Sequence, residues 1–131
     1  MTRRQSIYLE GFAHVNPVPA ACRIGPYLQT GVITGRDPET HEMPEGLDAQ
    51  MVNVFAHVRE LMGVAGGSTD DILKMVFHLV AYRDREALNR EWVAMFPDPE
   101  SRPARQVMAA TLDDASLVQA ELIAVLDERC R

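Results

Sequence analysis

Lysine is almost absent from this chain of 131 residues, in which Lys74 is the single example. The 13 basic residues are outnumbered by 19 acidic ones, which gives a net charge of -6 at pH 7. Clusters of lysine and arginine bind nucleic acids and anionic membranes, so the sequence predicts no nucleic acid and no membrane as a partner. No apolar run is long enough to span a bilayer, and none follows the arginines near the start, so no signal peptide is expected.

Cysteine is scarce as well, because only Cys22 and Cys130 occur. Two cysteines without a secretory signal do not form a disulfide framework, so we expect a reduced, cytoplasmic protein. The four histidines are never spaced as metal ligands, which predicts no metal site. The Gly-x-Ser-x-Gly elbow of serine hydrolases and the Gly-Lys-Ser or Gly-Lys-Thr of phosphate loops are also missing, so neither type of site is expected.

The residues that are present describe a single domain, 1–131, with the 47% hydrophobic and 24% charged residues of an ordinary globular protein. Alternating apolar residues predict strands, and apolar residues at helical spacing predict helices. Strands are expected at Gln5–His14, Ala20–Ile24, Tyr27–Thr34, Asp70–Tyr82 and in two runs of Ser101–Leu126, and helices at Glu45–Gly63 and Asp84–Phe96. This order predicts an α+β fold, a mixed sheet of about six strands with two helices on one face.

Local signals place the ends of several elements. Gly25-Pro26 predicts a hairpin turn, which leaves Tyr27 as an ordinary strand residue. The apolar stripe of the first helix, from Leu47 to Met62, is expected to face the core. Asp84 is expected to cap the second helix, whose Trp92 should be a core residue.

The stretch Ser101–Leu126 carries the candidate chemistry. It contains two extended runs joined by an acidic turn, and we expect the two strands to pair. Arg105 lies on the same strand face as Val107, and Glu121 lies on the same face as Ile123. A charge among apolar neighbours is paired, bound to a ligand or set at a solvated edge. Arg105 and Glu121 are therefore either a structural ion pair or edge residues, or they form a site in which the arginine binds a carboxylate at two points.

Two motifs in this stretch, Arg102-Pro-Ala-Arg105 and Val118-Gln-Ala-Glu-Leu-Ile-Ala-Val125, resemble the signature of a known family. The resemblance extends to shorter motifs earlier in the chain, namely Thr30-Gly31, Gly35-Arg-Asp-Pro38, Ala65-Gly-Gly-Ser-Thr-Asp-Asp-Ile72 and Leu88-Asn89. The family is that of the RidA/YjgF reactive-intermediate deaminases, and the similarity spans roughly residues 15–126.

The resemblance implies a chorismate-mutase-like fold and a homotrimer with sites between subunits. It also implies an enamine or imine deaminase that hydrolyses 2-imino or enamino acids of the 2-aminoacrylate type to 2-oxo acids and ammonia, with no cofactor. On the resemblance, Arg105 binds the substrate carboxylate and Glu121 orients the hydrolytic water or the arginine. Main-chain groups near Thr30-Gly31 and Val107 would position the nitrogen and the water. Asn89 matches a further substrate-binding position and could also tie the helix end to a loop.

One family position differs. In the register that aligns Asn16-Pro-Val-Pro-Ala-Ala21 with a family loop, Val18 replaces a tyrosine of the site. A smaller apolar residue leaves a roomier, less polar pocket, which favours an alternative: a pathway deaminase for 2-aminomuconate-like ring-cleavage products. A second alternative, from another class, is a non-catalytic ligand-binding or chaperone-like trimer.

A physical argument also favours the trimer. Strands such as Ile72–Tyr82 and Leu117–Leu126 are apolar on both faces, whereas two helices cover only one face of so wide a sheet. A closed ring of three chains would cover the second face. We expect Arg105 and Glu121 to lie on one chain and the next chain to supply part of the pocket wall.

Overall fold

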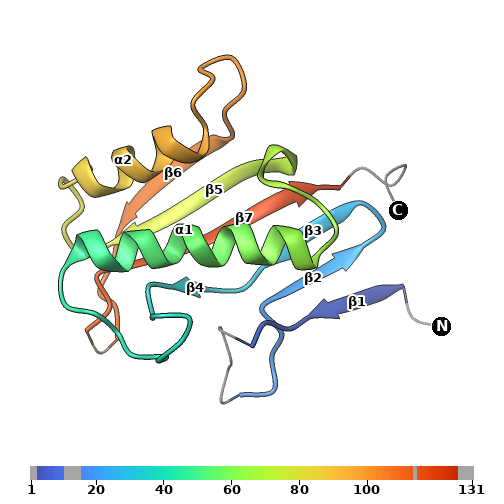
Figure 1. The fold of residues 1–131 in the computed structure, drawn as a ribbon, viewed down its shortest axis with the longest axis horizontal. Coiled ribbons are helices and arrows are strands. Elements are labelled where there is room, and N and C mark those ends of the chain that lie inside the picture. The colour runs from blue at the N-terminus through green and yellow to red at the C-terminus, as the bar shows by residue number, and fades with distance from the viewer. Residues whose placement is uncertain (1–2, 11–15, 114, 127–131) are drawn as a thin grey trace.

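The computed structural model describes residues 3–10, 16–113 and 115–126. In chain order its elements are β1 (Arg4–Ile7), β2 (Ala21–Ile24), β3 (Tyr27–Thr30), β4 (Ile33–Thr34), α1 (Leu47–Val64), the short 3-10 helix η1 (Thr69–Asp71), β5 (Ile72–Leu79), α2 (Glu86–Met95), β6 (Ala104–Ala109) and β7 (Val118–Val125). The seven strands form one mixed sheet, and Figure 1 shows both helices on the same side of it. The predicted α+β architecture is therefore confirmed.

The strands follow the order β1-β2-β3-β7-β5-β6, and β4 also pairs with β7. β5 and β6 run parallel because α2 lies between them in the chain and carries the backbone back along the sheet. β7 returns antiparallel on the other side of β5. The expected pairing of the last two strands with each other is therefore wrong, since β5 separates them. Of the expected first strand Gln5–His14, β1 covers only the beginning, and residues 11–14 lie outside the described part.

A bulge interrupts the expected strand Tyr27–Thr34. Gln29 pairs with Ile123 of β7, whereas Ile33 pairs with Ala120. The chain from Gln29 to Ile33 thus holds one residue more than the stretch of β7 opposite it, which is the pattern of a β-bulge. The bulge divides the expected strand into β3 and β4 and places a break in the ladder beside the centre of β7.

Two local signals had different outcomes. The turn predicted at Gly25-Pro26 joins β2 to β3, and Gly25 has a φ of 58°, which glycine adopts easily. The predicted cap Asp84 is wrong, because α2 begins at Glu86 and Arg85 takes the N-cap position without a side-chain bond to the helix. The Asp84 backbone N–H instead donates to the carbonyl oxygen of Ala81, which closes a turn before the helix.

In the described part of the chain, no helix has the length and apolar character needed to cross a membrane.

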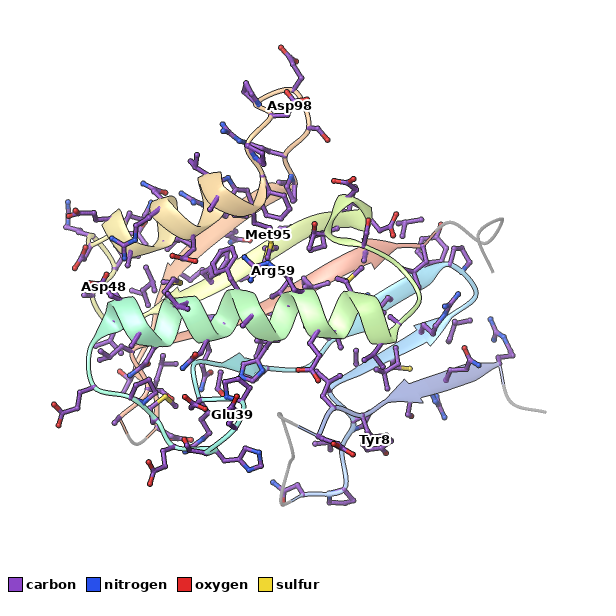
Figure 2. All side chains as sticks on the ribbon, in the orientation of Figure 1. Tyr8, Glu39, Asp48, Arg59, Met95 and Asp98 are labelled. Atoms are coloured by element: carbon purple, nitrogen blue, oxygen red, sulfur yellow. The ribbon has the colours of Figure 1, made fainter. Side chains whose placement is uncertain are left out.

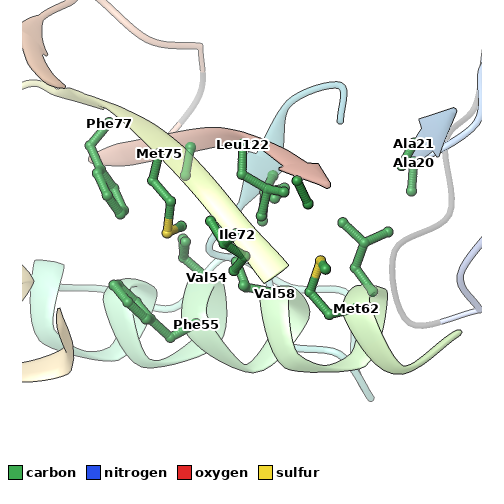
Figure 3. Close-up of a cluster of buried hydrophobic side chains, with 14 of the residues drawn as sticks. Ala20, Ala21, Val54, Phe55, Val58, Met62, Ile72, Met75, Phe77 and Leu122 are labelled. Carbon is green, nitrogen blue, oxygen red and sulfur yellow. The ribbon is translucent and has the colours of Figure 1, made fainter. Parts of the chain in front are cut away.

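The core lies between the two helices and one face of the sheet, called here the covered face. The apolar stripe predicted for α1 is buried against it and consists of Met51, Val54, Phe55, Val58, Leu61 and Met62. Phe55 stacks on Phe77 of β5 with ring centroids 5.8 Å apart. Figure 3 shows both side chains between α1 and the sheet. Trp92 of α2 meets Phe77 edge-on at 6.3 Å. Burial of these large side chains stabilises the packing of both helices on the sheet.

Buried polar groups fix the loop after β4 to α1. Gln50 is fully buried, and its Nε2 donates to the carbonyl oxygens of Pro44 and Ala115, both at 2.9 Å. Its Oε1 accepts a 2.8 Å hydrogen bond from the backbone N–H of Leu117. Gly35 lies so close to this helix that a Cβ added to it would be 2.6 Å from the Cβ of Gln50. The start of β7 and the loop after β4 are therefore both held against the first turns of α1.

The opposite face of the sheet, called here the open face, has no helix over it (Figure 1). Alternate residues of the strands form it: Cys22, Ile24, Tyr27, Gln29, Lys74, Val76, His78, Gln106, Met108, Gln119, Glu121, Ile123 and Val125. Many of these side chains are apolar, and the largest of them, Tyr27, is 65% exposed. The sheet therefore presents an apolar surface that nothing in the described chain covers.

Candidate functional site

Arg105 lies near the start of β6 and points to the covered face, beside α2. Its Nη1 donates a 2.9 Å hydrogen bond to Oδ1 of Asn89, and its guanidinium carbon lies 5.1 Å from the ring centre of Trp92. Asn89 and Trp92 are three residues apart on α2, so they point in similar directions. One helix face thus fixes the guanidinium by a hydrogen bond and a cation–π contact.

Arg105 keeps most of its binding capacity. Asn89 takes one of its several N–H donors, and no carboxylate of the described residues forms an ion pair with it. Burial lowers the pKa of the Arg105 guanidinium from its ordinary value, and the positive charge of Arg85 lowers it further. The group nevertheless remains cationic, because guanidinium does not deprotonate in proteins. A half-buried cation of fixed orientation is suited to bind a carboxylate at two points.

Glu121 lies in the middle of β7, and its side chain is exposed on the open face. It lines a cavity of about 230 Å³ together with Gln29, Thr30, Lys74, Val76, Leu122 and Ile123. The cavity places a carboxylate, a primary amine and a hydroxyl around one small volume. Such a cavity can orient a water molecule beside a small polar ligand.

Arg105 and Glu121 do not meet within one chain. Met75 of β5 pairs with Arg105 and with Leu122, whereas the next residue, Val76, pairs with Glu121. Successive residues of a strand point to opposite faces, so Arg105 faces the helices and Glu121 faces the other way. The interpretation of Arg105 and Glu121 as an ion pair within one chain is therefore wrong. The expectation that one chain contributes both residues to one pocket is wrong for the same reason.

Thr30 and Gly31 lie at the bulge between β3 and β4. The Oγ1 of Thr30 accepts a 3.0 Å hydrogen bond from the backbone N–H of Leu122, so the side chain replaces a ladder bond lost at the bulge. The N–H of Gly31 donates to the carbonyl oxygen of Ala20 at 2.9 Å, which leaves the Gly31 carbonyl as its available backbone group. A Cβ at Gly31 would meet its nearest neighbours at 3.8 Å, so this chain alone does not require glycine there.

Val107 lies at the free edge of the sheet, two residues after Arg105. The N–H of Ala110 donates to the carbonyl oxygen of Leu79 on β5, and backbone groups alternate in direction along a strand. The N–H and carbonyl groups of Arg105 and Val107 therefore point away from β5, toward the edge. There they can bond to a ligand or to another chain.

The predicted site residues thus fall into two groups. The edge group consists of Arg105, Asn89 and Val107, and the cavity group consists of Glu121, Thr30 and the adjacent Gly31. The sequence predicts Trp92 only as a core residue, although its spacing of three residues from Asn89 could have indicated its contact with Arg105. Lys74 of the cavity was not predicted, and no motif marks it.

Comparisons with known proteins show the family to which the chain belongs. The family model described as endoribonuclease L-PSP matches residues 12–126. The chain belongs to this family, that of RidA/YjgF. A RutC family protein of Aquifex aeolicus is 26% identical over 112 residues, which make up 85% of this chain and 90% of that protein. A RutC family protein of Pyrococcus abyssi is 28% identical over 112 residues, or 84% of this chain and 87% of the relative.

Solved structures of this family share the fold. RidA from the Antarctic bacterium Psychrobacter sp. is 31% identical with a TM-score of 0.85, and the match covers 93% of this chain and 99% of that one. The YjgF gene product of E. coli is 24% identical with a TM-score of 0.83, over 92% of this chain and 98% of that one, and shows the fold alone. The predicted family and fold class are therefore confirmed.

The register predicted for the family's first loop stays a prediction. Gly25-Pro26 is the turn between β2 and β3, and the segment that the register aligns with the family loop, Asn16–Ala21, leads into β2. Val18, which this register aligns with the family tyrosine, is 45% exposed. Among the described residues, no three His, Cys, Asp or Glu side chains lie together in a way that could hold a metal ion.

Proposed function

We propose that this RidA/YjgF-family protein is a cofactor-independent deaminase that hydrolyses 2-imino or enamino acids, of the 2-aminoacrylate type, to 2-oxo acids and ammonia. The observation that carries the proposal is the state of Arg105. Its guanidinium is half-buried and oriented by Asn89 and Trp92, and no carboxylate of the described chain pairs with it. A small carboxylate ligand suits such a group in charge and geometry.

The chemistry needs only a few groups. The substrate binds with its carboxylate on Arg105, and water attacks the imine carbon. A C–O bond forms, the electron pair of the C=N bond moves to nitrogen, and nitrogen takes a proton. The hydroxyl of this adduct then loses its proton and the nitrogen gains one; an oxygen electron pair forms the C=O bond as the C–N bond breaks, which releases ammonia and leaves a 2-oxo acid. An enamine first accepts a proton on carbon and becomes the imine. Glu121 serves as the base that orients the water and accepts its proton. Imines hydrolyse in water unaided, so orientation and modest charge stabilisation are sufficient.

We propose further that the site is completed between copies of the chain in a homotrimer. The edge group and the cavity group lie on opposite faces of the sheet, so they can share one ligand only if they come from different copies. The apolar open face, which includes the cavity group, supports this arrangement because a second copy would cover it. A closed ring of three copies repeats the same contact without leaving an uncovered end.

Ammonia release from 2-aminoacrylate generated in situ tests the activity. Arg105→Ala should lower kcat/KM by tens to hundreds fold, because loss of a two-point carboxylate contact costs on the order of 2–4 kcal/mol in the transition state. Arg59→Ala removes an exposed arginine of α1 and serves as the matched control, with an unchanged rate. Equal rates for Arg105→Ala and the native chain would overturn the proposal. Binding of a 2-oxo acid without turnover of any enamine would instead indicate a non-catalytic binding protein.

A second candidate function is favoured by Val18. Its short apolar side chain stands exposed where the family has a tyrosine, which leaves room for a larger substrate such as a 2-aminomuconate-like ring-cleavage product. Saturation kinetics with both substrate types decide between the two. A much larger kcat/KM for 2-aminoacrylate would exclude the larger class, and Val18→Tyr should lower activity only toward larger substrates if the second candidate is correct.

A further inference from the structure

Helix α2 presents charged residues on two different sides. On the side toward α1, Nη2 of Arg90 lies 2.7 Å from Oδ1 of Asp48. Asp48 lies at the end of α1 that is beside α2 in Figure 2. Asp84 and Glu86 line the same cavity between the two helices. The carboxylates that flank the start of α2 therefore belong to the α1 side, and the side that faces β6 has a different character.

Asn89 and Trp92 of α2 contact Arg105 of β6, and Arg85 is the N-cap residue that precedes this helix. The backbone N–H of Asn89 donates to the carbonyl oxygen of Arg85 at 2.8 Å, so the two residues are one helical turn apart. Side chains at this spacing are neighbours, with Cβ atoms about 5–6 Å apart. Because Oδ1 of Asn89 accepts the bond from Arg105, the helix places Arg85 next to the edge group.

The two arginines are held in the same manner. The guanidinium of Arg85 lies 4.6 Å from the ring centre of Tyr82, and its Nε donates to the Tyr82 carbonyl oxygen at 3.0 Å. Arg105 lies over Trp92 in the same way and donates one hydrogen bond. Each cation is thus oriented by an aromatic ring and one acceptor, and each retains further N–H donors.

No carboxylate of the described chain forms an ion pair with either of these cations. They are close enough for the charge of Arg85 to lower the pKa of Arg105. Two neighbouring like charges without a counter-ion repel each other, and a ligand with one negative charge relieves only part of that repulsion. A ligand with two separated negative groups would compensate both.

We propose that Arg85 determines specificity and that the preferred substrate is a 2-imino or enamino acid whose side chain ends in a second carboxylate. The inference rests on the deaminase function proposed above and adds a substrate class to it. Arg105 binds the carboxylate next to the imine carbon, and Arg85 binds the carboxylate of the side chain. Charged recognition of this kind separates substrates by the difference in affinity for the anionic and the neutral side chain.

Two imines of similar length test this inference. One is generated in situ from glutamate by an amino-acid oxidase and ends in a carboxylate, and the other is generated from methionine and ends in a neutral thioether. The native chain should hydrolyse the glutamate-derived imine with a kcat/KM about tenfold higher, because an added charge contact has that order of effect. Arg85→Ala should remove this preference while leaving the methionine-derived imine within about twofold of its native value.

The matched control is Arg83→Ala, which removes an exposed arginine two residues earlier and should preserve the preference. Arg85→Lys keeps the charge and should restore part of it. Arg85 also bonds to the turn at Tyr82, and a purely structural role would lower both rates equally in Arg85→Ala, which would overturn the inference. A native chain that hydrolyses both imines equally well would overturn it too.

Failure of the deaminase function is distinguishable from failure of this inference. If no imine is hydrolysed, calorimetry with 2-oxoglutarate and with the 2-oxo acid of methionine measures the same preference as binding. Arg85→Ala should then weaken the binding of 2-oxoglutarate about tenfold and leave that of the neutral analogue unchanged. Equal loss for both ligands, or no loss for either, would exclude the role of Arg85.

Discussion

Both faces of the sheet carry apolar side chains, but the described chain covers only one of them. On the covered face, Met75, Phe77 and Leu79 of β5 are completely buried under the helices. On the open face, Tyr27 is 65% exposed and Val125 is 40% exposed. The covered face stabilises the single chain, whereas the open face has the composition of a surface that another molecule covers. The covered face therefore accounts for the folding of the single chain, whereas the open face is the proposed surface for assembly.

The residues of the candidate site are also divided between the two faces of the sheet. Arg105 and Asn89 belong to the covered side at the sheet edge, and Glu121 belongs to the cavity on the open face. In the proposed function, one chain therefore supplies the carboxylate-binding Arg105, and a different copy must supply Glu121 if the two are to act on one substrate.

The covered face should be the most sensitive to substitution. Phe77→Ala removes a ring that packs between Phe55 and Trp92, and should lower the free energy of unfolding by about 3–5 kcal/mol. Phe77→Leu keeps part of the volume and should cost less. Denaturant unfolding at one fixed protein concentration measures both values. A loss below about 1 kcal/mol for Phe77→Ala would show that the two helices do not depend on this packing.

A charge on the open face should act on assembly instead. Val125→Lys places an ammonium group beside Tyr27, its partner on β3, and should weaken association by on the order of 2–3 kcal/mol because the charge would be desolvated between copies. The matched control is Val52→Lys on the outer side of α1, where valine is similarly exposed. Size exclusion with light scattering should show a smaller species for Val125→Lys alone. Equal masses for the two variants would exclude the open face as the interface.

A smaller effect is expected where the loop after β4 meets α1. Gly35→Ala would place a Cβ 2.8 Å from the backbone oxygen of Gln50, which cannot move aside easily, and should destabilise the chain by about 1–2 kcal/mol. Gly63→Ala has nothing within 4 Å and replaces a glycine inside α1, so it should stabilise by about 0.5–1 kcal/mol. Thermal unfolding of both variants measures the contrast, and opposite signs are the expected result. A neutral Gly35→Ala would show that the loop is not tightly held.

Several features could be predicted because they depend on residues close together in the chain. The buried stripe of α1 follows from helical spacing, the turn at Gly25-Pro26 from its two residues, and the alternation of Glu121 with Leu122 from strand geometry. Each of these signals survives in the structure because packing did not compete with the local preference.

Other features depend on contacts that are distant in sequence. Alternation showed that Arg105 and Glu121 each have apolar neighbours, but whether they share a face depends on how β6 and β7 pair with β5. The crossover through α2 sets the parallel pairing of β6 with β5, and no local sequence motif predicts this pairing. The predicted helix cap at Asp84 is wrong for a related reason, because Asp84 ends a turn that follows β5 and the helix begins only at Glu86.

The central claim is that one copy supplies Arg105 and another supplies Glu121, and a mixture of two variants tests it most directly. Arg105→Ala and Glu121→Gln are each expected to be nearly inactive alone. After unfolding and joint refolding in equal amounts, about one quarter of the sites in a three-membered ring would combine a native Arg105 with a native Glu121 from the neighbouring copy. Ammonia release should therefore recover to about that fraction of the native rate. Mixing Arg105→Ala with the double variant should recover nothing, and a mixture of the two single variants that stays as inactive as its components would contradict the account.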